Sequence, residues 1–378
     1  MKKNIKQIYI HINIKEKKYF VGTLANIQNK IYFEYDQKFL KKSLELSIFK
    51  LPLKSGAQEN KDKEFNSLFG LFYDSFVEPL SEYTLEALLN IKENKIGALE
   101  YSLKKKIPLK DSTSTIQKEF FLSETTPSIV EKKILLQVNQ RKNTFLYNNE
   151  NLKEEFSYWL LKIPSSKTPY YSANIEYAYS LMAKKAGLDI PQNYLFKNSS
   201  QHSYYGVKRF DKEGKNSIHI HSLAGLIHSD YRISNLDYDD FLSITLAITK
   251  NIKDLHKAFR LVCYIVLSHI KDHNEQDIIF LMTDKGDWHL APASNLSFSY
   301  GNSGKYNMKV MGEKSWIRKK HLIQLAQAHD IKNYIQIIDE VSTAISNWTT
   351  FATIANVPKE EALKINTILH RINLNEKN

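Results

Sequence analysis

The apolar residues of this 378-residue chain change their spacing along its length, and this change limits the folds that it can adopt. Four isoleucines from Ile8 to Ile14 alternate with polar residues, and a period of two predicts a strand with one buried face. After about residue 217, apolar residues recur mainly at helical spacing, as in 236–250 and 256–270. The chain is therefore predicted to be α+β, with its strands mainly in the first part.

The same patterns predict the remaining elements and a division into three units. Strands are expected at 19–25, 30–36, 132–138, 158–164, 204–211, 278–282 and 288–292, and helices near 81–91, 172–187 and 359–372. Ser172 is expected to cap its helix and Gly187 to end it. We expect a β-rich subdomain over 1–105, an α+β unit over 106–216 and a helical unit over 217–378.

The charge of the chain leaves two interpretations open. Lys and Arg number 53 against 41 Asp and Glu, a formal net charge of +12. The lysines are scattered, which is typical of a solvated surface, but an anionic partner such as nucleic acid or an acidic protein would also fit. The single cysteine, Cys263, lies in an apolar run and fits a reducing cytosol. We find no signal peptide or membrane-spanning run and expect a cytoplasmic protein.

Five polar residues occur in an order that indicates phosphoryl transfer. Lys162 lies in a predicted strand and Glu176 on the helix that follows. Asp272 and Asp277 follow a long helix, and Asn295 comes just after the hairpin. This is the order of a protein-kinase-like phosphotransferase. Lys162 would neutralise phosphate charge while paired with Glu176, Asp272 would accept or orient the substrate hydroxyl, and Asp277 and Asn295 would offer oxygen ligands to Mg²⁺.

Several motifs in order resemble those of the HipA-family serine/threonine kinase toxins. The family segments RxHMHSLAGLLHADFR, NRDDHAKNFSFL and LAPAYDL stand here as SIHIHSLAGLIHSDYR (217–232), IKDHNEQDIIFL (270–281) and LAPASNL (290–296). The N-terminal part is similar through VGTL, FEYD, LPL, GLFYDS and IGALEYS. The resemblance extends from near residue 8 to about 350.

The resemblance implies a fold, an activity and partners. The fold would be protein-kinase-like and bilobal, with an extra N-terminal β-rich subdomain and a helical C-terminal lobe. The activity would be ATP–Mg²⁺-dependent serine/threonine phosphorylation of a translation protein, typically an aminoacyl-tRNA synthetase. The partner would be a HipB-like helix-turn-helix antitoxin, through which the toxin meets DNA.

The resemblance also assigns further residues. The family hinge corresponds to Arg209, Phe210 and Asp211, with Asp211 near the ribose. Lys133 matches the lysine of the phosphate-binding segment. Regulatory autophosphorylation would fall in the same segment, at Thr126 or Ser128.

Two departures from the family pattern keep a second function open. The family carries Asn on the loop and Asp after the hairpin, whereas this chain has Asp277 first and Asn295 second. In addition, no glycine occurs from 98 to 186, where the family has a phosphate-cradling glycine. The exchange is either a compensated swap that keeps the ligand charge or the mark of a pseudokinase. In the second case, the chain would be a weak or inactive module that binds an antitoxin or a DNA complex.

Three histidines in the segment 217–232 have two interpretations. His219, His221 and His228 resemble metal ligands in spacing, but neither a cysteine nor another type of ligand lies near them. We interpret them as structural. His273, next to Asp272, is interpreted as a loop contact rather than a base.

Overall fold

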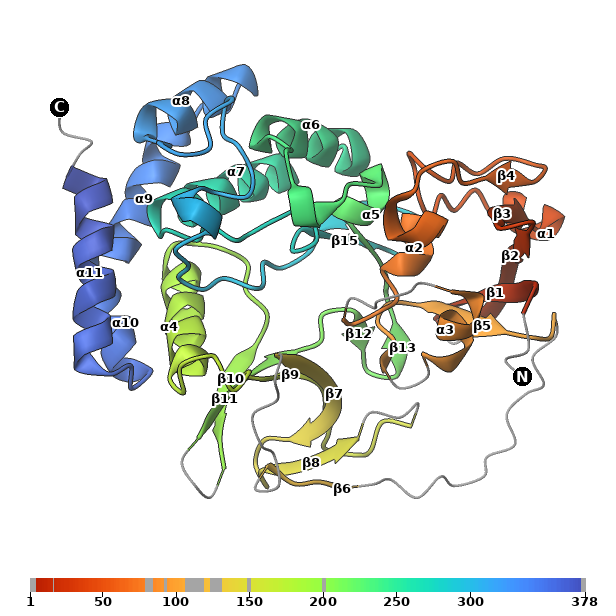
Figure 1. Cartoon of the computed structure of the whole chain (residues 1–378), viewed down its shortest axis with the longest axis horizontal. Coiled ribbons are helices and arrows are strands. Elements are labelled where there is room, and N and C mark those ends of the chain that lie inside the picture. Colours follow the sequence, from red (N-terminus) through yellow and green to blue (C-terminus); the bar gives the residue numbers. More distant parts are fainter. Residues whose placement is uncertain are drawn as a thin grey trace.

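The computed structural model describes the chain over residues 5–15, 17–78, 84–91, 94–105, 119–122, 131–147, 151–198 and 202–374. Three larger sheets and a set of helices make up this part, as Figure 1 shows. The strands precede residue 223 except for one hairpin, and most helices follow it. This order agrees with the change from a period of two to helical spacing in the sequence.

The first sheet is five-stranded and antiparallel, with the order β4-β3-β2-β1-β5. Its strands are β1 (Gln7–Ile14), β2 (Lys17–Ile27), β3 (Lys30–Tyr35), β4 (Gln58–Glu59) and β5 (Leu99–Ser102). Three short helices accompany it: α1 (Gln37–Leu40), α2 (Gly70–Tyr73) and α3 (Leu85–Asn90). In β1, Ile8, Ile10 and Ile12 are fully buried, which confirms the predicted strand, but His11 on the other face is also buried, at 4% exposure, so the burial is not confined to one face.

The second sheet is six-stranded, with the order β10-β11-β9-β7-β8-β6, and lies at the bottom of Figure 1. Its strands are β6 (Glu119–Phe120), β7 (Lys132–Asn139), β8 (Thr144–Tyr147), β9 (Ser157–Ile163), β10 (Asn193–Lys197) and β11 (Ser203–Lys208). It has its own apolar cluster around Trp159 and Phe196. Helix α4 (Ser172–Lys185) packs against β10 and β11.

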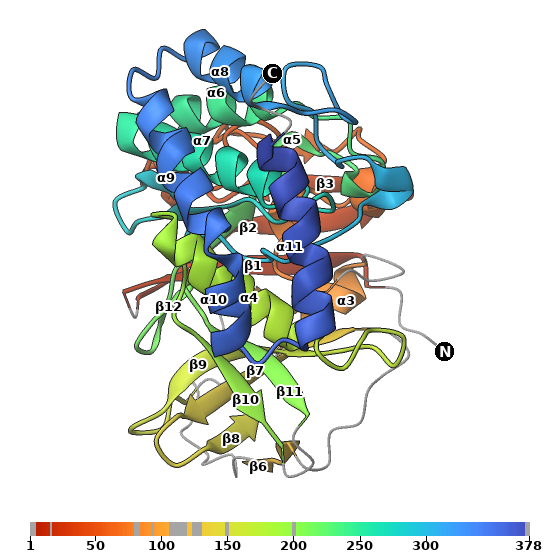
Figure 2. The same ribbon diagram turned by 90° about the vertical axis from the view of Figure 1, so that its left-hand side faces the viewer.

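The helical part begins after a two-stranded ribbon and encloses a three-stranded sheet. The strands are β12 (Lys212–Glu213), β13 (Asn216–Ser217), β14 (His219–Ser222), β15 (Ile279–Met282) and β16 (Trp288–Leu290). The helices are α5 (Leu223–Ile227), α6 (Tyr238–Thr249), α7 (Ile252–Leu267), α8 (Lys319–Ala328), α9 (Tyr334–Ser346), α10 (Trp348–Ile354) and α11 (Lys359–Leu374). Three 3₁₀ turns cover Glu64–Ser67, Tyr231–Ile233 and Asn302–Gly304. Helix α10 contacts α4, and Figure 2 shows α11 beside them.

Most of the predicted elements are confirmed, but two details of the prediction are wrong. Ser172 is the first residue of α4 and Tyr171 precedes it without a side-chain cap, so Ser172 is not the cap. The strand expected over 204–211 ends at Lys208, because β11 is paired only that far. Gly187 follows the end of α4 with φ +81°, as a helix-ending glycine does. The unit limits at residues 105 and 216 stay predictions.

Strand β14 is bonded through two buried histidines to segments of the N-terminal part that lie outside its sheet. The Nε2 of His219 lies 3.1 Å from the carbonyl oxygen of Leu46. The ring of His221 lies between Asp74 Oδ2, 2.5 Å from its Nδ1, and Ser47 Oγ, 3.0 Å from its Nε2. This Ser–His–Asp row is no catalytic triad, because His221 is fully buried and Ser47 is 1% exposed. Its role is to satisfy polar groups across the junction.

The third histidine of the segment holds α2 to α5. His228 Nε2 accepts a hydrogen bond from the Gly70 N–H at 3.0 Å, so its Nδ1–H donates to Asp62 at 2.7 Å. A Cβ at Gly70 would lie 2.1 Å from the carbonyl oxygen of Gly225. The two helices approach this closely only because both residues are glycines. The three histidines of 217–232 therefore contact the N-terminal part of the chain.

We predict that His219 makes folding stability depend on pH. Burial lowers the pKa of His219 to about 4 from an ordinary value of 6.5. The unfolded chain therefore binds a proton that the folded chain excludes, and stability falls as the pH drops from about 6.5 towards 4. In urea unfolding, His219→Gln should reduce the loss between pH 7 and pH 5 by about 2 kcal/mol. The exposed His202→Gln should leave that loss unchanged, and an unaltered loss in His219→Gln would contradict the prediction.

Candidate active site

A buried ion pair joins the six-stranded sheet to α4. Lys162 lies in β9, between Lys133 of β7 and Tyr205 of β11 in the strand register. Its Nζ is 2.5 Å from Oε1 of Glu176, and the two side chains are 13% and 12% exposed. A lysine in an apolar strand requires such a partner, because an unpaired buried charge is costly. The structure thus brings together two residues that the sequence predicts as partners.

Each charge of this pair depends on the other. Burial acts to lower the pKa of Lys162, but the carboxylate of Glu176, together with the negative charges of Glu131 and Asp277, outweighs burial, and the pKa of the ammonium is raised. Burial raises the pKa of the Glu176 carboxyl, and the ammonium opposes that shift. A charged lysine beside an open cavity is therefore maintained by a glutamate that has no other described ion-pair partner.

A hydrogen bond joins the two predicted metal ligands. Asn295 Nδ2 donates to Oδ1 of Asp277 at 2.6 Å, and the Asn274 N–H donates to Oδ2 of Asp277 at 3.1 Å. Asn295 has φ +56°, a conformation that Asn and Asp adopt more readily than most residues. Two carboxylates at 277 and 295 would repel each other here. An amide facing a carboxylate avoids this repulsion, whichever position holds which group.

Asp272 lies at the exposed side of the same loop. Its backbone N–H donates to Oγ of Ser299 at 3.0 Å, and its carbonyl oxygen accepts a hydrogen bond from Asn307 Nδ2 at 2.7 Å. Partial burial, together with the negative charge of Asp277, raises the pKa of the Asp272 carboxyl. The backbone of Asp272 is thus fixed while the residue remains exposed to solvent.

Two adjoining cavities share the predicted residues. The inner cavity, of about 210 Å³, has apolar walls that include Leu160, Val207, Phe210 and Ile279. The outer cavity, of about 610 Å³, reaches Asp272. Both are lined by the residues of a common boundary: Lys133, Lys162, Glu176, Asp277 and Asn295. An apolar chamber behind a charged boundary can hold a flat ring with an anionic tail.

The predicted hinge residues line the inner cavity, but two of them, Arg209 and Asp211, are hydrogen-bonded to each other. Arg209 Nε donates to Asp211 Oδ1 at 2.9 Å, and the Nη2 donates to Oδ2 at 2.6 Å. The Gly97 N–H also donates to Asp211 Oδ2 at 2.7 Å. These bonds tie the hinge to the N-terminal part of the chain. They leave Phe210 as the hinge residue whose side chain is open to the apolar chamber.

The predicted phosphate-binding segment is only partly described. Lys133 lines both cavities, and burial together with the Lys162 charge lowers the pKa of its ammonium. Its backbone N–H donates to Glu78. The predicted autophosphorylation sites Thr126 and Ser128 lie outside the described residues.

Sequence reasoning missed several residues of the inner cavity wall. Asp74 and Ser222 line it, and Gln276 Nε2 donates to the Tyr73 hydroxyl at 2.8 Å beside them. The motif GLFYDS contains both Tyr73 and Asp74, so its resemblance to the family was an available signal. The N-terminal subdomain therefore contributes directly to the site.

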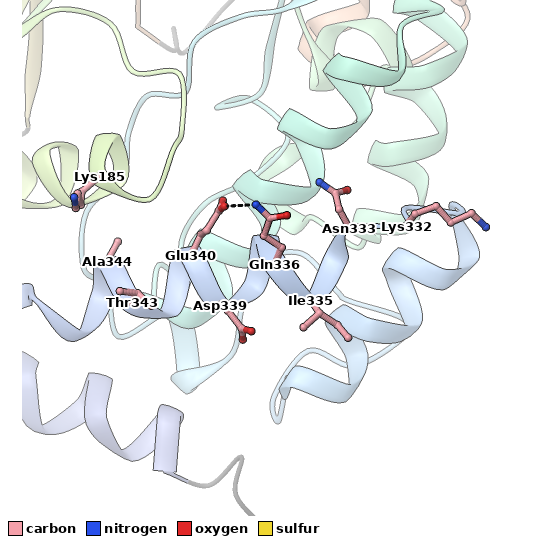
Figure 3. A pocket seen from close by; sticks show the side chains of 9 residues that line it. All are labelled: Lys185, Lys332, Asn333, Ile335, Gln336, Asp339, Glu340, Thr343 and Ala344. Atoms are coloured by element: carbon pink, nitrogen blue, oxygen red, sulfur yellow. Dashed lines mark hydrogen bonds between the residues drawn. The ribbon is translucent and has the colours of Figure 1, made fainter.

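A separate hollow lies along one face of α9, as Figure 3 shows. Its walls combine Lys185 and Lys332 with Asp339 and Glu340, and it includes no predicted site residue. In the described part of the chain, no group of three or more His, Cys, Asp and Glu residues lies where it could hold a metal ion. No helix of that part has the length and apolar character to cross a membrane.

The described architecture is a known one. A chain in the solved complex of the Shewanella oneidensis MR-1 toxin–antitoxin proteins HipA and HipB with operator DNA has the same fold, at a TM-score of 0.71 and 12% identity over 95% of both chains. The Helicobacter pylori proinflammatory kinase CtkA matches 59% of this chain and 91% of its own at 10% identity, with a TM-score of 0.36, which is too low to show a shared fold. No curated protein matches the sequence.

A family model assigns the chain to a family directly from its sequence. The model for the HipA-like C-terminal domain matches residues 130–348, which is more than half of the chain. The chain therefore belongs to the HipA family, as its motifs predict. The matched range contains both members of the Lys162–Glu176 pair.

We predict that Glu176→Gln lowers the free energy of unfolding by about 3 kcal/mol, since it leaves the Lys162 ammonium buried without a counter-charge. Urea unfolding at pH 7 measures this. Lys162→Met in the same background should recover most of the loss, because neither charge of the pair then stays buried. The matched control is Glu155→Gln in the exposed Lys142–Glu155 pair, where the change should stay within about 0.5 kcal/mol. Equal effects in the two pairs would refute the role of burial.

Proposed function

We propose that this chain is an ATP–Mg²⁺-dependent serine/threonine protein kinase that acts as the toxin of a HipA/HipB-like pair. The observation that supports this most is the common boundary of the two cavities, where the Lys162–Glu176 pair faces Asp277 and Asn295. The apolar chamber on one side of this boundary can hold a nucleotide base, and the boundary itself can hold the phosphate chain. The Asp272 loop on the other side can hold an acceptor hydroxyl.

The nucleotide would bind with its base in the inner cavity. Leu160, Val207 and Phe210 offer apolar contact to an adenine ring. Lys162 would bind the phosphates, and Glu176 would keep its ammonium oriented. Lys133 would add a second positive charge, as its family position implies. Asp211 would support the hinge through Arg209 and Gly97, and any contact with the ribose would have to share an oxygen that already accepts hydrogen bonds.

The donor set at the boundary fits a hard divalent cation. Asp277 offers carboxylate oxygens and Asn295 an amide oxygen, which are ligand types that Mg²⁺ accepts. When bound, Mg²⁺ supplies positive charge to the phosphates. Asp272 would orient the substrate hydroxyl and receive its proton. The predicted phosphorylation of Thr126 or Ser128 would remove the segment before Lys133 from the nucleotide site and silence the enzyme.

The proposed partners come from the family. The Shewanella complex contains HipB and operator DNA, which supports a HipB-like antitoxin for this chain and contact with DNA through it. We expect a protein of translation as substrate, such as an aminoacyl-tRNA synthetase.

One observation favours a second candidate. Both carboxylate oxygens of Asp277 accept hydrogen bonds, from Asn295 and from the Asn274 N–H. Each oxygen keeps a further lone pair, so the second candidate requires that these bonds hold the carboxylate in an orientation that no cation can use. The chain would then be an inactive module that binds an antitoxin or a DNA complex. The two tests below separate the candidates.

The first test is transfer of labelled phosphate from ATP–Mg²⁺ to protein. We predict that Asp272→Ala reduces the transfer at least about 100-fold, since it removes the group that accepts the hydroxyl proton. The ATP-induced shift in melting temperature should remain in Asp272→Ala and disappear in Lys162→Met. Absence of both transfer and thermal shift in the unaltered chain would favour the inactive module.

The second test concerns the exchanged ligands. We predict that Asp277→Asn and Asn295→Asp each reduce transfer at least about 100-fold, because the site then has two amides or two carboxylates. The double variant restores one of each and should stay within about tenfold of the unaltered chain. A sharp rise in the double variant would show that the present pair is a degraded one.

A further inference from the structure

The segment that follows Asn295 is bonded directly to the loop that carries Asp272. Ser299 Oγ accepts hydrogen bonds from the backbone N–H groups of Lys271 and Asp272, at 2.7 and 3.0 Å. The backbone N–H of Asn307 donates a hydrogen bond to the carbonyl oxygen of Lys271 at 2.8 Å. A substrate whose hydroxyl reaches Asp272 must therefore lie against this segment.

The segment is strongly basic. Between Ser299 and Lys320 the sequence has six Lys or Arg residues and a single acidic one, Glu313. Lys271 adds a further charge next to Asp272. Residues 1–20 are as basic, with six lysines and one acidic residue, so the position of these charges next to Asp272, and not their number, distinguishes the segment.

Four lysines lie in or next to the backbone that bonds the Asp272 loop: Lys271 in the loop, Lys305 and Lys309 on either side of Asn307, and Lys314, whose carbonyl oxygen accepts a hydrogen bond from the Tyr306 N–H at 3.0 Å. Lys271 Nζ donates to the Gly304 carbonyl oxygen at 2.6 Å, and Lys314 Nζ donates to that of Ser234 at 2.8 Å. Partial burial and the charges of Lys309 and Lys305 lower the pKa of Lys314, and the carboxylate of Glu275 opposes this shift. Since an ammonium has three donors, the two carbonyl bonds leave most of the donors free.

Apart from Glu275, which acts to raise the pKa of Lys314, the nearby acidic residues are held by other groups. Glu313 Oε1 accepts hydrogen bonds from three successive backbone N–H groups, and Asp237 accepts bonds from those of Met311 and Gly312. Asp230 is paired with Arg232. Over the described residues, Lys271, Lys305, Lys309 and Lys314 form no ion pair. We refer to these four lysines as the lysine platform.

We propose that the lysine platform binds an acidic segment of the protein substrate beside the hydroxyl that is phosphorylated. This inference rests on the proposed kinase function and adds the chemical class of the substrate. Carboxylates of the substrate would meet the platform while a neutral hydroxyl meets Asp272. A nucleic acid fits less well, because its phosphates would also approach the negative charges of Asp272 and Asp277.

The experiment measures binding and transfer with the same probes. Three labelled peptides carry a central serine flanked by Asp and Glu, by Lys and Arg, or by neutral residues. Fluorescence anisotropy with the full chain and ATP–Mg²⁺ gives their affinities, and labelled phosphate gives transfer. We expect the acidic peptide to bind at least tenfold more tightly than the basic one, with a difference that shrinks at high salt.

Two double variants of equal charge change provide the control. Lys305→Glu/Lys309→Glu should weaken binding of the acidic peptide at least tenfold and keep the ATP-induced thermal shift. Lys54→Glu/Lys215→Glu, at exposed positions elsewhere, should leave that binding within about twofold. Equal losses in the two variants would mean a general charge effect and overturn the proposal.

The outcomes separate this inference from the proposed function. No ATP-induced thermal shift and no transfer to any peptide would defeat the kinase proposal and, with it, the inference. Transfer of phosphate with equal affinity for the three peptides would support the kinase proposal but overturn the proposal that the lysine platform binds an acidic segment. Tighter binding of a single-stranded RNA 12-mer than of the acidic peptide, lost in Lys305→Glu/Lys309→Glu, would assign the platform to nucleic acid and overturn the proposal as well.

Discussion

The buried pair of Lys162 and Glu176 is the interaction on which the candidate site depends. A strand of one sheet and the helix beside it each contribute one charge, and neither charge is stable there alone. The pair sets the distance between β9 and α4, and it keeps an ammonium at the boundary of two cavities. Asp277 and Asn295 reach the same boundary from the loop and the hairpin. Their hydrogen bond shows how an exchange of Asp and Asn keeps one carboxylate and one amide in contact.

The junction between the N-terminal sheet and the helical part builds the other wall of the site. His219, His221 and His228 satisfy polar groups across this junction, and Asp74 serves both His221 and the cavity wall. Asp211 ties the hinge to Gly97 in the same way. The N-terminal part of the chain, through α2 and the residues that follow it, is thus part of the site, and the family motif GLFYDS lies there.

The sequence predicted those parts of the fold and the site that rest on local periodicity and ordered motifs. The isoleucines of β1, the apolar face of α7 and the partnership of Lys162 with Glu176 all follow from spacing and order. The roles of His221 and Asp74 did not, because they are 147 residues apart and only the folded chain brings them together. The hydrogen bond between Asn295 and Asp277 could not be predicted from the sequence either, since the identity of two residues does not fix which of their atoms are in contact. The cap at Ser172 failed because a local preference yielded to the geometry of the preceding turn.

The most direct measurement is a crystal structure of the full chain with a non-hydrolysable ATP analogue and magnesium. The account predicts a base in the chamber of Leu160, Val207 and Phe210, phosphates at Lys162, and a cation bound by Asp277 and Asn295. A nucleotide bound elsewhere would contradict it. So would an empty cavity at saturating nucleotide, with the bond from Asn295 to Asp277 unchanged.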